Sequence, residues 1–112
     1  MNFLVLVAEA DHFERWAVVD EAGRAAFFEA LSAFEEAVAA RGSIVAGAGL
    51  APPAQAVTLR PGQPLAVGPY AETVEQMGGF YLIDVPDLET AVEVARLMPA
   101  HVTVEVRPTA DE

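Results

Sequence analysis

Cysteine and lysine are both missing from this chain of 112 residues. Without cysteine, disulfides, thiol catalysis and cysteine-based metal sites are excluded. The 2 histidines, His12 and His101, form no motif with the spacing of a zinc site, so no metal is expected. The 6 basic residues, all Arg, face 17 acidic ones, which gives a formal net charge of −11. Nucleic acids and anionic membranes attract clustered positive charge, so the composition argues against both as partners.

Long apolar runs are also missing, and the N-terminus lacks the basic segment of a signal peptide. These absences predict a cytoplasmic protein without a membrane span. No glycine-rich phosphate loop or other cofactor motif occurs, so no cofactor is expected. Apolar residues nevertheless make up 54% of the chain, which predicts a folded protein, with a single domain over residues 1–112.

The hydrophobic pattern predicts two helices and a mostly antiparallel sheet. Residues 3–8 form a continuous apolar run, which is typical of a strand buried on both faces. Residues 9–20 are polar and predict a loop or a short helical turn. Apolar residues at helical spacing then predict a helix over 21–41, ended by Gly42 in a left-handed C-cap.

The second half of the chain predicts a second helix and several strands. This helix begins after Asp87 as N-cap and ends near Met98, before Pro99. Strands are expected at 43–50, 54–60, 65–67, 79–85 and 102–107. The order of elements predicts a ferredoxin-like α+β sandwich. Because the first strand is apolar on both faces, a second subunit is expected to cover the open face of the sheet in a homodimer.

The densest group of functional side chains lies in a loop between Gly68-Pro69 and Gly78-Gly79. Glu72 and Glu75 are three residues apart, so on a helical turn they would share a face, and either could act as a general base. The alternative is that Glu72 braces the loop and Glu75 is solvated.

Aromatic and cationic side chains near this loop suggest a binding site. Tyr70 and Tyr81 could form a wall for a planar organic ligand, or could pack in the core or a dimer interface. Arg60 and Arg107 could each bind a carboxylate, although ion pairs with nearby acids are the alternative.

The remaining polar candidates fall in the predicted loops. We interpret His12, next to Asp11, as a surface loop histidine and His101 as a residue at a strand end. Trp16 is expected to anchor its loop against the core or a partner subunit.

Residues 68–75 (Gly-Pro-Tyr-Ala-Glu-Thr-Val-Glu) and 78–83 (Gly-Gly-Phe-Tyr-Leu-Ile) resemble the signature of the DGPF branch of the YCII-related family. Residues 3–7, Gly42, the corner at 50–52 and the closing segment 104–108 match in the same order, so the resemblance covers nearly the whole chain. The resemblance implies a dimeric ferredoxin-like α+β barrel. Members of this branch are often encoded beside sigma factors, which implies an accessory role with a sigma-factor partner as one alternative.

The chain departs from this pattern where catalysis is proposed for relatives. Val67 replaces the aspartate of the motif, Tyr70 its phenylalanine and Val74 its lysine. The predicted helix over 21–41, where catalytic relatives place a histidine, contains none. The His-Asp pair proposed for those relatives therefore cannot form at the family positions.

These observations predict an aromatic or carboxylated small ligand, bound in a pocket between the sheet and the Gly68-to-Gly78 loop of a homodimer. The first alternative is a lyase or hydrolase with Glu72 or Glu75 as general base, and the second is the sigma-factor accessory protein. The sequence leaves open whether the protein is an enzyme.

Overall fold

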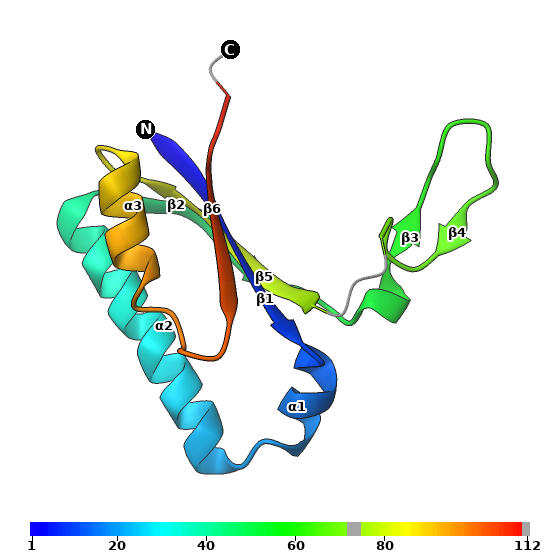
Figure 1. The fold of residues 1–112 in the computed structure, drawn as a ribbon, viewed down its shortest axis with the longest axis horizontal. Helices are drawn as coiled ribbons and strands as arrows, with labels where there is room; N and C mark the ends of the chain where they lie inside the picture. Colours follow the sequence, from blue (N-terminus) through cyan, green and yellow to red (C-terminus); the bar gives the residue numbers. More distant parts are fainter. Residues whose placement is uncertain (72–74, 111–112) are drawn as a thin grey trace.

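The computed structural model describes residues 1–71 and 75–110. Within them it forms an antiparallel sheet in the order β2-β5-β1-β6, a separate hairpin of β3 and β4, and three α-helices (Figure 1). The elements are β1 (Asn2–Ala10), α1 (His12–Val18), α2 (Glu21–Arg41), β2 (Ser43–Gly49), the 3₁₀-helix η1 (Pro53–Gln55), β3 (Val57–Thr58), β4 (Ala66–Val67), β5 (Glu75–Asp84), α3 (Leu88–Ala95) and β6 (Thr103–Pro108). The prediction of the α+β class is confirmed.

Strand β1 lies in the middle of the sheet, with Val5 opposite Tyr81 of β5 on one side and Val106 of β6 on the other. Side chains alternate between the two faces of a strand. The set that starts with Phe3 and Val5 is buried, whereas the intervening side chains, from Leu4 onward, are only half-buried. A single chain therefore covers one face of β1, and the prediction of burial on both faces is not met within it.

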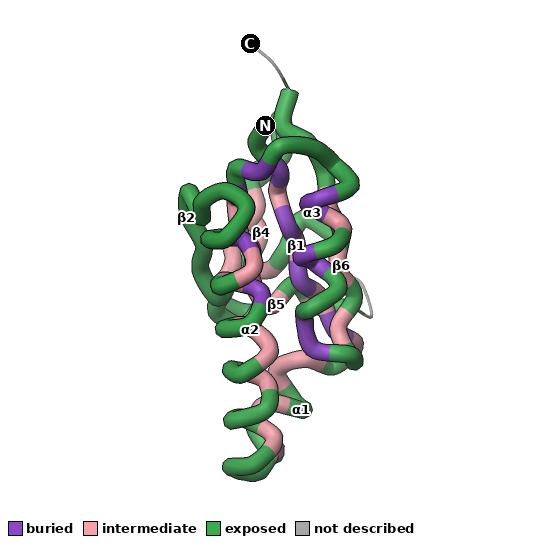
Figure 2. The backbone as a smooth tube through the Cα atoms, turned by 90° about the vertical axis from the view of Figure 1, so that its left-hand side faces the viewer, coloured by how far each residue is buried: buried purple, intermediate pink, exposed green. Residues whose placement is uncertain are grey.

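Helices α2 and α3 lie together on one side of the sheet and supply the other half of the core (Figure 1). The side chains of Phe34 and Val38 of α2 and of Ala91 and Val94 of α3 are buried against the sheet. In Figure 2 buried positions run along β1 and part of α3, while β2 is exposed throughout. The core is therefore concentrated at one end of α2, which leaves its N-terminal half free to border a cavity.

The helix boundaries follow local sequence signals, with two corrections. Helix α2 has the predicted bounds, and the Asp87 side chain caps α3 by accepting from Thr90 N at 2.8 Å. Helix α3 ends at Ala95 rather than near Met98. Gly42 is extended, with φ 179°, and not left-handed. A Cβ there would collide with the backbone carbonyl of Asp84, so the glycine serves a close approach of α2 to β5.

The extents of several strands also differ from expectation. Strand β2 has an irregular register between Ile44 and Ala46. Strand β5 begins at Glu75, before the predicted start at Gly79. The two strands expected at 54–60 and 65–67 shrink to β3 and β4, which pair as predicted. Their hairpin projects from the side of the sheet opposite α2 and α3 (Figure 1).

Residues 9–20 form more structure than the polar sequence predicted. Glu9 still belongs to β1, Asp11 adopts a left-handed conformation with φ 53°, and α1 follows directly. Aspartate tolerates this conformation better than most residues. The sharp reversal folds α1 back beside β5. None of the helices in the described part of the chain combines the length and apolar character needed to cross a bilayer.

Candidate functional site

A cavity of about 350 Å³ lies between α1, the N-terminal half of α2 and the sheet, and we call it the α1–α2 cavity. Its volume falls in the range of sites that bind small molecules. Aromatic residues from three elements border it, together with a few polar groups. The aromatic lining includes Trp16, Phe27, Phe28 and Tyr81, and the ionisable lining consists of Glu9, His12, Glu35 and Tyr81 among the described residues.

Three aromatic rings join α1 to α2 at one side of the cavity. The Trp16 ring centroid lies 5.2 Å from that of Phe27 and 5.7 Å from that of Phe28. Such tilted and edge-on arrangements are favourable for aromatic pairs. Trp16 thus packs against α2 outside the buried core, whereas the sequence led us to expect contact with the core or a partner subunit.

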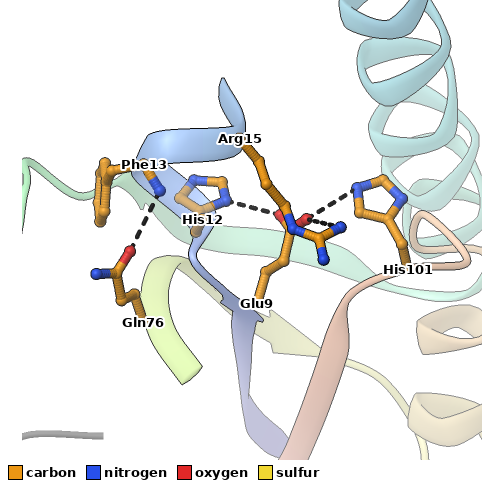
Figure 3. Close-up of polar contacts among 6 residues, drawn as sticks. All are labelled: Glu9, His12, Phe13, Arg15, Gln76 and His101. Atoms are coloured by element: carbon orange, nitrogen blue, oxygen red, sulfur yellow. Dashed lines mark hydrogen bonds and ion pairs between the residues drawn. The ribbon is translucent and has the colours of Figure 1, made fainter. Parts of the chain in front are cut away.

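Glu9 is the centre of a polar cluster at the end of β1 (Figure 3). Its residue is only 6% exposed, and its Oε2 lies 2.9 Å from His12 Nδ1. Its Oε1 lies 3.7 Å from both Arg15 Nη1 and His101 Nε2. A buried carboxylate is tolerated when such partners compensate its charge. In the described ranges no three His, Asp or Glu side chains are arranged to hold a metal ion.

His12 is oriented by this carboxylate. A carboxylate only accepts hydrogen bonds, so Nδ1–H of the neutral imidazole donates to Glu9 and Nε2 keeps its lone pair. That Nε2 lies over Gly78, where an added Cβ would come within 2.7 Å of it. Phe13 N donates to Gln76 Oε1 at 3.2 Å, which fixes the first turn of α1 on β5.

This arrangement corrects one interpretation of the sequence. His12 is not a surface loop residue: it begins α1, is half-buried, and pairs with Glu9 rather than with the neighbouring Asp11. Helix α1 therefore contributes a histidine to the cavity, while α2, the helix predicted over 21–41, contains none. His101 lies just before β6, as predicted, and is half-exposed beside Glu9.

Tyr81 and Glu35 form a second polar pair on the cavity wall. The Tyr81 hydroxyl donates to Glu35 Oε2 at 3.1 Å, and its ring packs against Phe34 with centroids 4.9 Å apart. Burial, followed by the hydrogen bond and the charge of Glu35, raises the pKa of Tyr81 to about 12. Gly47 gives the ring its space, because a Cβ there would lie 2.7 Å from Tyr81 Cδ1.

The other predicted site residues lie elsewhere. Tyr70 is 81% exposed, and its carbonyl accepts from Arg60 Nη2 at 2.6 Å. Arg107 forms an ion pair with Glu105 at 2.6 Å, the structural alternative considered from the sequence. Glu75 starts strand β5 instead of lying on a helical turn, and accepts from Thr103 Oγ1 at 2.6 Å. Glu72 lies outside the described residues. Among those described, the structure thus places Tyr81 alone at the cavity.

Comparison with known proteins agrees with the resemblance noted from the sequence. A model of the YCII-related domain matches residues 1–108, which include every residue of the cavity. An uncharacterized protein of Rhizobium meliloti (strain 1021) is 40% identical over 87 residues, covering 71% of this chain and 70% of that protein.

The orientation of His12 can be tested directly. We predict that its neutral imidazole carries the proton on Nδ1, because Glu9 accepts there. Long-range ¹H–¹⁵N NMR spectra distinguish the two ring nitrogens. Glu9→Gln should weaken this preference, whereas Glu14→Gln, which removes an exposed acid from α1, should leave it unchanged. A proton found on Nε2 in the unaltered chain would contradict the prediction.

A second prediction concerns the titration of Tyr81. The chain has 2 tyrosines, so Tyr70→Phe isolates its phenolate absorbance, and we expect the midpoint to reflect a pKa of about 12. The pKa of an unfolded tyrosine is about 10, so the corresponding stabilisation is complete below pH about 10 and is lost as the pH rises toward 12. Adding Glu35→Gln should lower the midpoint, and adding Glu36→Gln should not. A midpoint near 10 before these changes would refute the assignment.

Proposed function

The chain belongs to the YCII-related domain family, and from this membership and its cavity we propose that it binds a small aromatic molecule between α1 and α2. The observation that carries the proposal is the juxtaposition of an aromatic wall with two oriented polar pairs, Glu9–His12 and Tyr81–Glu35. Ligand sites characteristically combine an apolar lining with a few fixed polar groups. We also propose that the chain belongs to the DGPF branch of the family and that its fold is ferredoxin-like. The strand order β2-β5-β1-β6 supports the proposed fold.

The proposed site differs in position from the pocket expected beside the Gly68-to-Gly78 loop. It retains Tyr81 from that expectation, and Gly78 is the described residue of the loop that lines it. The cavity supports a ligand-binding role, whereas a sigma-factor accessory protein would need an exposed apolar surface for its partner, such as the one on the β3–β4 hairpin.

A catalytic role is the second candidate, and it is favoured by the hydrogen bond of His12 to Glu9, which leaves the lone pair of Nε2 free. A lyase or hydrolase that abstracts a proton needs a base beside its substrate. His12 Nε2 borders the cavity and keeps a lone pair, with Glu9 able to stabilise the imidazolium that would form. Glu75, one of the two bases considered from the sequence, is bonded to Thr103 and does not line the cavity. The tautomer measurement proposed above tests the basis of this candidate.

Binding of a neutral aromatic probe tests the main proposal. We expect 2-naphthol to shift the NMR signals of the Gly47 amide and the indole N–H of Trp16, the one Trp of the chain. Leu31→Phe narrows the cavity and should weaken binding about tenfold or more. Ala33→Phe adds the same ring at an exposed position of α2 and should leave binding unchanged. Shifts confined to residues outside the cavity would refute the site.

We also propose that two copies of the chain associate through the open face of the sheet and the β3–β4 hairpin. The hairpin carries large apolar side chains in water: Val57, Leu59, Leu65 and Val67 are 60%, 75%, 58% and 76% exposed. Contiguous exposed apolar surface of this kind marks an interface. The half-buried face of β1 lies on the side toward which the hairpin projects, so one partner could cover both.

Light scattering coupled to gel filtration tests the homodimer. We predict that the unaltered chain elutes with twice its mass of 11.9 kDa. The double variant Leu59→Glu, Val67→Glu should elute as a monomer, because charges in an apolar interface are costly. Val18→Glu alters an 84% exposed residue of α1 away from the hairpin and should leave the dimer intact. An unaltered chain that elutes as a monomer would overturn the proposal.

A further inference from the structure

We propose that the α1–α2 cavity selects an organic cation, a protonated amine attached to an aromatic body, and that the Glu35 carboxylate recognises the amine. This inference rests on the proposed function and adds the charge of the ligand to it. It rests on the charged side chains that line the cavity and on the hydrogen bonds and ion pairs that each of them forms.

The two carboxylates on the cavity wall differ in how their charge is balanced. Glu9 already has His12, Arg15 and His101 around it. Glu35 accepts one hydrogen bond, from the Tyr81 hydroxyl, and forms no ion pair within residues 1–71 and 75–110. A neutral donor leaves the charge of Glu35 in place, and its second oxygen makes none of the described hydrogen bonds. Glu35 is therefore the group that a ligand cation would neutralise.

The rest of the lining suits a cation on an aromatic body. No arginine is among the described lining residues, and the chain contains no lysine, so a ligand carboxylate near Glu35 would find no permanent positive charge in the lining. Trp16, Phe27 and Phe28 offer ring surfaces for an aromatic body, and the Arg24 guanidinium already lies 5.2 Å over the Trp16 ring. The net charge of −11 draws cations toward the protein as a whole.

A neighbouring cavity provides a contrast within the same fold. It also borders Glu9, Trp16 and Phe27, but its lining includes Arg15 and His101. An anionic ligand would find the guanidinium of Arg15 there. The two cavities thus differ in charge, because Arg15 offsets Glu9 in the second cavity, and the α1–α2 cavity is the one that disfavours a carboxylate.

The test compares three probes that share one aromatic body and differ in charge: phenethylamine, 2-phenylethanol and 3-phenylpropanoate. Their affinities are measured by NMR titration of the full chain, following Gly47 and the indole of Trp16. We expect phenethylamine to bind about tenfold or more tightly than 2-phenylethanol, because charge-assisted hydrogen bonds are strong in a partly buried site. We expect 3-phenylpropanoate to bind most weakly at these residues.

Two matched variants separate local recognition from the overall field. Glu35→Gln and Glu36→Gln change the net charge equally, but Glu36 is exposed and does not line the cavity. The glutamine oxygen at position 35 can still accept from Tyr81, so the fold should persist. Glu35→Gln should abolish the preference for phenethylamine, and Glu36→Gln should retain it. Tyr81→Phe removes the competing hydroxyl and should retain or increase it.

Each outcome bears on a particular claim. If 2-phenylethanol binds in the cavity as tightly as phenethylamine, or if Glu35→Gln leaves the preference intact, the selection of a cation is refuted and the aromatic site stands. If 3-phenylpropanoate binds most tightly at Gly47 and Trp16, the assigned charge is wrong. If neither these probes nor 2-naphthol binds there, both the inference and the proposed function fail.

Discussion

The burial of one carboxylate, Glu9, determines how the functional end of this fold is arranged. Glu9 continues the alternation that points Phe3, Val5 and Val7 into the core, so it enters the protein on the buried face of β1. An unpaired charge in that position would cost several kcal/mol. Its partners come from α1 and from the segment before β6. Pairing them holds α1 beside β5 and creates walls for the cavities on both sides of Glu9.

Local sequence signals predicted the parts of the fold that they determine. Helix α2 and the N-cap of α3 follow from periodicity and from Asp87, and Val102, Val104 and Val106 pack on the core as their alternation indicates. Gly42 was recognised as a helix end but for the wrong reason, because its close approach to Asp84 depends on tertiary packing. Helix α1 was expected only as a loop or a short helical turn, because it is short and because contacts with β5 and the aromatic residues of α2 stabilise it.

The candidate site was predicted only at Tyr81, where a glycine pair precedes an aromatic strand. The Glu9–His12 pair was missed although the sequence holds its signal: an acid at an inward position of an apolar strand, followed three residues later by a histidine. From the sequence, Asp11 was the carboxylate considered beside His12, because it is adjacent to it. Its left-handed conformation turns the chain so that residues 9 and 12 meet. The pairing of Tyr81 with Glu35 had no local signal, since α2 and β5 meet only in the folded chain.

The unequal partners of the two carboxylates separate the stability of the fold from the selectivity of the cavity. Glu9 is neutralised by groups of its own chain, so its charge is used in folding and a change there would disturb α1 and the segment before β6 together. Glu35 stands on α2, which the buried side chains of Phe34 and Val38 hold to the core. Selectivity at Glu35 can therefore change at little cost in stability, whereas the Glu9–His12 pair is constrained by the fold. In a family that binds different ligands on one scaffold, we expect the Tyr81–Glu35 pair to vary and the Glu9–His12 pair to be kept.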